Sequence, residues 1–207
     1  MKFFSPPNQM TFLRIALTPV FATFLLSPNL AMQQWSVVIF SLAAITDWYD
    51  GWLARRWGYV TRWGVFLDPL ADKVLTSAAF IVFAYLYLVS WWMVWAIVIR
   101  DAVITLLRSY AEYKGKPVDT SKLAKTKTFT QYVVIYYILL VFIAHQTPAL
   151  DENFGELINS LLDQTLIYVL MIIITTITLW TGIVYIIDNW KIIRELYDFS
   201  TQPTKSE

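Results

Sequence analysis

Four aspartates occur where the surrounding sequence is strongly apolar: Asp47, Asp50, Asp68 and Asp72. The first two are three residues apart and the last two are four apart, so each pair lies on one face of a helix. An acidic side chain inside an apolar helix costs roughly 2.5–3.5 kcal/mol on insertion scales, so each needs a stabilising partner. Clustered carboxylates repel unless protons or cations intervene, and hard divalent cations prefer oxygen ligands. The pattern therefore predicts a site for one or two Mg²⁺ or Mn²⁺ ions that serves phosphate chemistry.

The residues around these aspartates favour a large phosphate ligand. Gly51 and Ala54 continue the face of the first acidic pair with little bulk, and Arg55 is suited to a phosphate group. The stretch 55–67, which contains Gly64, predicts a hairpin that joins the two acidic helices and brings all four carboxylates to one end.

A structural role for the aspartates is the alternative. In membrane bundles, aspartates also form ion pairs that hold helices together, and Asp47 or Asp50 could pair in this way with Arg100.

Long uncharged stretches predict the helices that must position this site. The 32 residues from 15 to 46 carry no charge, and one helix of that length would measure ~48 Å, too long for a ~30 Å hydrocarbon core. Ser27-Pro28-Asn29 divides this stretch by turn chemistry. A signal peptide over 1–32 and a single tilted helix over 74–99 are the alternatives. The predicted fold is an all-α bundle of six transmembrane helices, near 10–27, 33–55, 68–88, 91–112, 128–147 and 165–187.

The basic residues predict the orientation of these helices. The expected outer segments 28–32, 89–90 and 148–164 contain no Lys or Arg, and we expect the acidic third segment to be a solvated loop. This asymmetry predicts cytoplasmic N and C termini and a cytoplasmic site. The expected inner segments hold the basic residues Lys2, Arg55, Arg56, Arg62, Lys114, Lys116, Lys122, Lys125, Lys127, Lys191, Arg194 and Lys205.

The amino-acid composition excludes several further classes of function. Of the 207 residues 57% are hydrophobic and 15% charged, against roughly 45–50% and 25% in soluble domains. The net charge of +1 favours no nucleic-acid partner. Cysteine is absent and there is one histidine, so thiolate chemistry and two-histidine mechanisms are excluded. We interpret residues 1–207 as one membrane domain that ends in a short polar tail, 198–207.

The complete acidic motif is Asp47-x2-Asp50-Gly51-x2-Ala54-Arg55-x8-Gly64-x3-Asp68-x3-Asp72. It resembles the signature of the CDP-alcohol phosphotransferase family, and every signature position is matched. The resemblance implies a homodimeric membrane enzyme with six transmembrane helices, which displaces CMP from a CDP-linked alcohol with an acceptor hydroxyl. It also implies that all four aspartates are metal ligands and that Asp72 is the general base. The CDP site would be lined by Gly51, Ala54, Arg55 and Gly64.

Four further stretches resemble bacterial members that make phosphatidylglycerophosphate. The resemblance implies CDP-diacylglycerol as donor, sn-glycerol 3-phosphate as acceptor and the bacterial inner membrane as location. Two positions depart from the usual pattern, where Ala124 replaces a glycine and Asp101 a more common glutamate. The four stretches contain Pro7, Asn8, Thr11 and Arg14; Leu67 to Lys73; Arg100, Asp101, Ile104 and Arg108; and Lys125, Lys127, Thr128 and Gln131, with Thr178 to Trp180 and Tyr185 later.

The phosphate of this acceptor requires fixed cations, and Arg108, Lys125 and Lys127 are the candidates. Inward-positive topology is the alternative explanation of the two lysines. Arg100 is a candidate partner of the acidic cluster or of Asp101. Rival functions are transfer to serine, inositol phosphate or phosphatidylglycerol, and transport of a divalent cation.

Overall fold

The computed structural model describes the backbone of residues 6–57, 62–113 and 122–197, and the side chains of 11–46, 71, 73–111 and 127–194. Within these ranges every element is a helix. The helices are α1 (Pro6–Leu25), α2 (Leu30–Trp57), α3 (Arg62–Tyr85), α4 (Trp91–Tyr113), α5 (Lys122–Gln146), α6 (Pro148–Leu161), α7 (Gln164–Asp188) and α8 (Trp190–Tyr197).

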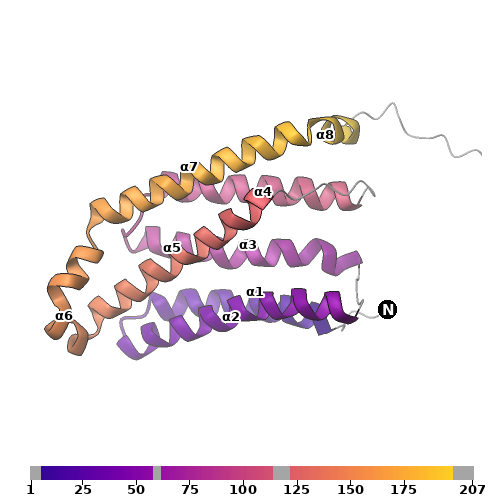
Figure 1. The fold of residues 1–207 in the computed structure, drawn as a ribbon. Helices are drawn as coiled ribbons and strands as arrows, with labels where there is room; N and C mark the ends of the chain where they lie inside the picture. Colours follow the sequence, from indigo (N-terminus) through magenta and orange to yellow (C-terminus); the bar gives the residue numbers. More distant parts are fainter. Residues whose placement is uncertain (1–5, 58–61, 114–121, 198–207) are drawn as a thin grey trace, which may run out of the picture.

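The long helices run lengthwise and alternate in direction (Figure 1). One end of the bundle carries α8, and we call it the α8 end. The first turns of α1 and α3 and the last turns of α2 and α7 also lie there. The turns from α1 to α2 and from α3 to α4 lie at the opposite end with α6, which we call the α6 end. α1 packs against α2 and α3, α3 against α4, and α4 against α7. α5 also packs against α7, so residues far apart in the sequence meet where α4 and α5 approach α7.

Polar side chains cap the first turns of two of these helices. The Asn29 Oδ1 atom accepts the backbone N–H of Ala31 at 2.9 Å at the start of α2. The Asp163 Oδ1 atom accepts the N–H groups of Thr165 and Leu166 at 2.9 and 3.0 Å and caps α7. These bonds satisfy N–H groups that have no partner within a helix, so the turns at the α6 end are defined by local chemistry.

Aromatic and aliphatic side chains fill the interior. The ring of Phe40 lies 5.1 Å from that of Phe21 and 5.2 Å from that of Tyr136, so it joins α1, α2 and α5. Phe21 and Phe40 are fully buried. Large apolar side chains also cover much of the outer surface, among them Trp35, Ile99 and Ile183. An apolar exterior around an apolar interior is expected of a helical bundle that faces lipid.

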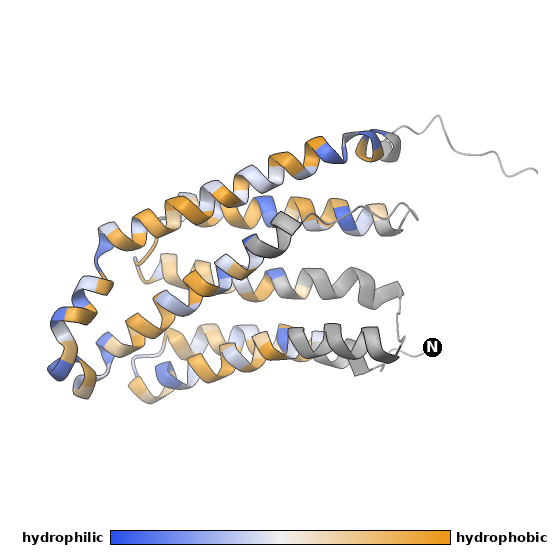
Figure 2. Cartoon of the chain, viewed as in Figure 1, coloured by the Kyte–Doolittle hydropathy of each residue, from blue (hydrophilic) through white to orange (hydrophobic). Residues whose placement is uncertain are grey.

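Two helices within the described ranges are long and apolar enough to cross a membrane: 127–146 of α5 and 164–188 of α7. Figure 2 shows hydrophobic residues along both helices and hydrophilic positions on α6 and α4. Shorter apolar helical stretches occupy 11–25, 30–46 and 73–85. Each of the six predicted spans overlaps one of α1–α5 or α7. That all six cross the membrane stays a prediction.

Two local expectations are wrong. Residues 148–161 are helical instead of a loop, with a kink at Phe154 (φ −133°, ψ 19°). Pro148 fits the first turn of a helix, and Asp151 interacts favourably with the positive end of its dipole. The predicted hairpin 55–67 is also too long, because α2 continues to Trp57 and α3 already begins at Arg62. Gly64 therefore belongs to the first turn of α3.

Candidate active site

The acidic motif occupies the ends of α2 and α3 that meet at the α8 end (Figure 1). Asp50 precedes the last residue of α2 by seven positions, and Asp68 follows the first residue of α3 by six. At ~1.5 Å per residue, both lie within about 11 Å of their helix ends. Among the described side chains no group of three or more forms a candidate metal site. The motif side chains lie outside the described ones: Asp47, Asp50, Gly51, Ala54, Arg55, Gly64, Asp68 and Asp72.

A buried ionic cluster joins α4, α5 and α7. The Asp101 Oδ1 atom accepts hydrogen bonds from Arg100 Nη1, at 2.9 Å, and from Lys127 Nζ. The second oxygen, Oδ2, accepts from Gln131 Nε2 at 3.2 Å. Arg100 Nη2 also donates to Thr181 Oγ1 at 2.9 Å. We call these five residues the Asp101 cluster.

The cluster carries more positive than negative charge. Asp101 is 3% exposed and Lys127 is 2% exposed, and one carboxylate is shared by two cations. The ammonium group of Lys73, on α3, acts through its charge on both residues. Burying charges is costly unless they are paired and hydrogen-bonded, and the three donors on Asp101 meet that requirement. The Asp101 cluster together with Lys73 thus carries excess positive charge, and Lys73 directly follows Asp72 of the acidic motif in the sequence.

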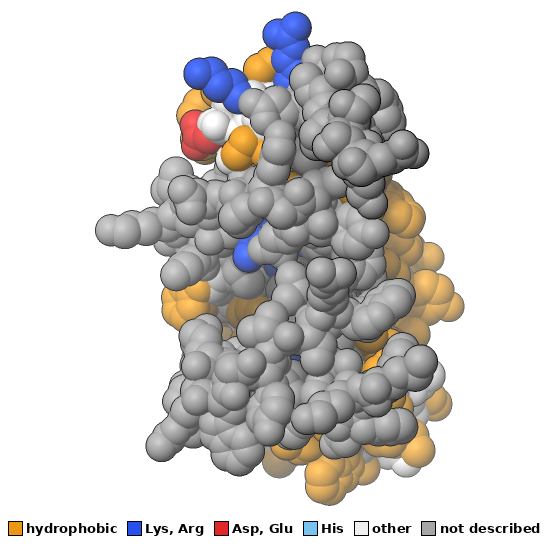
Figure 3. All heavy atoms as spheres, turned by 90° about the vertical axis from the view of Figure 1, so that its right-hand side faces the viewer, with side chains coloured by type: hydrophobic (Ala, Val, Ile, Leu, Met, Phe, Trp, Pro, Cys, Tyr) orange, Lys and Arg blue, Asp and Glu red, His pale blue; other side chains and the backbone are white. Residues whose placement is uncertain are grey.

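Two further arginines lie in the half of the bundle toward the α8 end. Arg14, on α1, is 1% exposed, and Arg108, on α4, is half-buried two turns beyond Arg100 toward the α8 end. The predicted acceptor residues thus divide into a buried lysine, Lys127, a half-buried arginine, Arg108, and Lys125, whose side chain lies outside the described ones. Figure 3 looks onto the α8 end, where described Lys and Arg side chains are visible near α8 and in the middle of the face.

Sequence reasoning found part of this cluster. The pairing of Arg100 with Asp101 is confirmed. The contribution of α7 was missed, because Thr181 and Gly182 carry no charge and match no motif. The available signal was the spacing of Thr178, Thr181 and Gly182, which places small side chains on one helix face. All three are buried.

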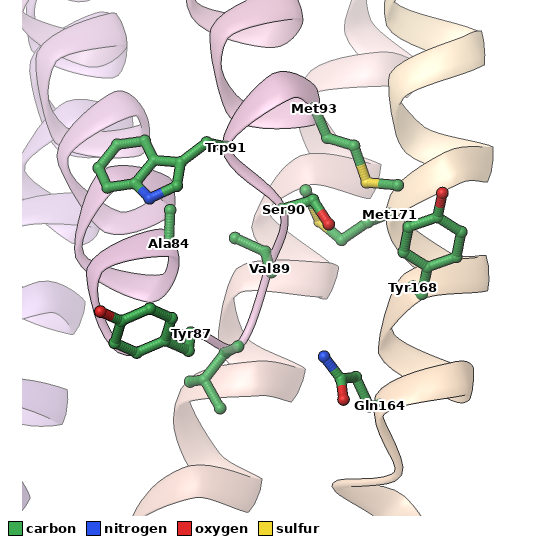
Figure 4. A pocket seen from close by; sticks show the side chains of 10 residues that line it. Ala84, Tyr87, Val89, Ser90, Trp91, Met93, Gln164, Tyr168 and Met171 are labelled. Atoms are coloured by element: carbon green, nitrogen blue, oxygen red, sulfur yellow. The ribbon is translucent and has the colours of Figure 1, made fainter.

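The opposite end of the bundle differs in chemistry. A cavity of about 320 Å³ lies between the α3–α4 turn and α7, lined by Tyr87, Trp91, Met93 and Tyr168 among others (Figure 4). Tyr87 there has a positive φ of 59°. Between the end of α5 and the start of α6, His145 Nδ1 lies 3.3 Å from Asp151 Oδ1, and both side chains are 42% exposed. Neither feature belongs to the candidate site, which lies toward the α8 end.

Residues 4–151 match the family model described as CDP-alcohol phosphatidyltransferase. The chain belongs to the CDP-alcohol phosphatidyltransferase family. The match includes the whole of α1 to α5, hence the whole acidic motif, Asp101 and Lys127. The sequence-based assignment to this family is confirmed, and with it the assignment to the phosphatidyltransferase enzymes.

Three curated relatives of this CDP-alcohol phosphatidyltransferase carry the name CDP-diacylglycerol–glycerol-3-phosphate 3-phosphatidyltransferase. The protein from Bacillus subtilis (strain 168) is 38% identical over 149 residues. Those from Salmonella typhimurium (strain LT2) and Escherichia coli (strain K12) are 39% and 38% identical over 141 residues. Each comparison covers 66% of this chain and 77% of the relative.

Proposed function

We propose that this chain transfers the phosphatidyl group of CDP-diacylglycerol to sn-glycerol 3-phosphate and forms phosphatidylglycerophosphate and CMP. The names of the relatives at 38–39% identity carry this proposal. The buried positive charge around Lys127 supports it independently, because the acceptor brings a phosphate dianion that must be neutralised. An acceptor without a phosphate group, such as serine, would not require this positive charge.

The metal ligands fit the proposed chemistry by type and position. Asp47, Asp50, Asp68 and Asp72 are oxygen ligands on adjoining ends of two consecutive helices that contact each other. They would hold one or two Mg²⁺ or Mn²⁺ ions, which supply charge neutralisation for the pyrophosphate and for the leaving CMP. Cations at the acidic face and a phosphate dianion at the Asp101 cluster would each balance the excess charge of its surroundings.

Within this arrangement Asp72 has a second task besides holding the metal. Asp72 would take the proton from the primary hydroxyl of the acceptor while that oxygen attacks the phosphorus bearing diacylglycerol. The bond from that phosphorus to the oxygen of CMP breaks, and CMP leaves. Gly51, Ala54 and Gly64 would leave room for CDP, with Arg55 on its phosphates.

Lys127 and Arg108, together with Lys125, would bind the phosphate of the acceptor. Lys127 is already hydrogen-bonded to Asp101, but an ammonium group has three donors, so two remain for other partners. Lys127 can therefore keep its ion pair and bind a phosphate oxygen at the same time.

The membrane arrangement that we propose has six spans, with the α8 end facing the cytoplasm. The segments at the α6 end, 26–29, 86–90 and 147–163, contain no Lys or Arg, whereas basic residues are numerous in 114–127 and 191–194. A site at this boundary would let CDP reach the acidic motif while the acyl chains stay in lipid. Location in a bacterial inner membrane and a homodimeric state are implied by the family resemblance and stay predictions.

The test is CMP release by the purified chain in detergent with CDP-diacylglycerol and Mg²⁺ or Mn²⁺. Glycerol 3-phosphate, serine and inositol phosphate are offered separately, and Asp72→Asn serves as the control for contaminating activity. Release with glycerol 3-phosphate alone is the expected result. Release only with another acceptor would refute the proposed acceptor, and no release from a folded sample would refute the proposed reaction.

A further inference from the structure

The side chain of Arg100 lies directly against α7. Its Nη2 group donates to Thr181 Oγ1 at 2.9 Å, and the Thr181 hydroxyl donates to the backbone oxygen of Thr178 at 3.0 Å. A Cβ atom placed on Gly182 would lie 2.8 Å from Arg100 Nε and 3.0 Å from its Cγ. Real Cβ atoms essentially never lie closer than 3.0 Å to such an atom, so the absence of a side chain at Gly182 is what makes room for the guanidinium.

The position of Arg100 in turn determines that of two other charges. Its Nη1 group and the Lys127 ammonium share the Oδ1 atom of Asp101. The other oxygen of Asp101 is bonded to Gln131. Because Asp101 is 3% exposed, few other partners can replace Arg100 if it moves. A displacement that begins at Gly182 is thus transmitted through Asp101 to Lys127.

We propose that Thr181 and Gly182 are positioning residues of the acceptor site. They hold Arg100 so that Asp101 presents the Lys127 ammonium to the acceptor phosphate, and this inference rests on the proposed function. α7 lies outside residues 4–151, the part of the chain that matches the family model. The acceptor site therefore depends on a helix to which the family match assigns nothing.

Close packing of α4 on α7 is the competing explanation of a glycine at this position, since small residues allow membrane helices to approach. The contacts favour the positioning role. The three atoms nearest to the added Cβ all belong to the Arg100 side chain, and none to the backbone of α4. An alanine here would thus first displace Arg100.

The first experiment compares Gly182→Ala with Gly155→Ala in the full chain in detergent. Initial rates of CMP release are measured with glycerol 3-phosphate varied at saturating CDP-diacylglycerol, and then the reverse. We expect Gly182→Ala to raise KM for glycerol 3-phosphate about tenfold, as for partial loss of a charged hydrogen bond, with KM for the lipid unchanged. At Gly155 the added Cβ would meet only the Asp151 side chain, at 3.6 Å, so both constants should stay at the wild-type value.

Thr181 gives an independent measurement if Gly182→Ala does not fold. Thr181→Val keeps the shape but removes the hydroxyl that accepts from Arg100, and it should raise the same KM. Thr181→Ser keeps the hydroxyl and should restore the wild-type value. Size-exclusion profiles and melting temperatures of all variants identify those that fold.

A double variant separates positioning from helix packing. If Gly182 acts through Arg100, adding Gly182→Ala to Arg100→Ala should change KM no further. The inference is overturned if Gly182→Ala and Thr181→Val leave KM for glycerol 3-phosphate unchanged, raise both KM values equally, or act as strongly without Arg100. A wild-type chain that does not use glycerol 3-phosphate would instead refute the proposed function, and the inference with it.

Discussion

Replacing Asp101 by asparagine removes one negative charge from the Asp101 cluster and keeps the size of the side chain. Lys127, 2% exposed, would then lie in the interior beside Arg100 and within reach of the charge of Lys73. The asparagine can still accept hydrogen bonds, but it cannot compensate the cations. We therefore expect Asp101→Asn to destabilise the fold more than an ordinary polar substitution.

The magnitude follows from the burial of the pair. Removing one partner of a buried ion pair costs about 3–5 kcal/mol, because the other charge is left uncompensated. For a chain of 150–250 residues, 1 kcal/mol lowers the melting temperature by about 2–4 °C. The expected decrease for Asp101→Asn is thus about 6–20 °C.

The assay is thermal unfolding of the purified variants in one detergent, followed by circular dichroism. Asp101→Glu keeps the charge and should melt within a few degrees of the wild type. Asp101→Asn combined with Lys127→Met removes both charges and should melt higher than Asp101→Asn alone. A single variant as stable as the wild type, or a double variant less stable than the single one, would refute this account of the cluster.

Three further results are expected. Asp72→Asn should nearly abolish CMP release, because the acceptor hydroxyl loses its base, and should leave CDP-diacylglycerol binding intact in a direct binding measurement; near-normal turnover would exclude that role. Lys127→Met should raise KM for glycerol 3-phosphate by roughly 10- to 150-fold, the loss of one charged hydrogen bond, and Arg108→Ala should act in the same direction. An equal rise in KM for the lipid would contradict the acceptor assignment. Chelation of divalent ions should stop CMP release, and Mg²⁺ or Mn²⁺ should restore it; full activity after chelation would contradict the metal site.

The sequence predicted the features that depend on hydropathy and on short spacing. The positions of the long helices followed from uncharged stretches, and the family followed from residues 47–72. The extent of α2 and α3 was less accessible, because arginine and tryptophan continue a helix as readily as they begin a loop. α6 could not be predicted, because acidic residues in a short segment are as typical of a solvated loop as of a helix.

The links between distant helices could not be predicted from one sequence. The contact of Arg100 with Thr181 joins residues 81 positions apart, and no local pattern encodes it. The charge of Lys127 and the resemblance of its stretch predicted a phosphate-binding role, whereas its ion pair with Asp101 depends on how α5 packs beside α4. Spacing along one helix is thus predictable, whereas contacts across helices depend on packing.

The helical structure of α6 has a consequence for the distant site. Its 14 residues form two short helical segments that meet at the kink at Phe154, so an ordered spacer, and not a free loop, joins the end of α5 to the start of α7. The spacer therefore sets where α7 begins along the bundle axis. That position determines which residues of α7 lie opposite those of α4. Deleting a single residue from this spacer would rotate α7 by about 100° or shift it along its axis, and Thr181 would no longer face Arg100. Insertions that a flexible loop would absorb should thus disturb chemistry at the far end of the molecule.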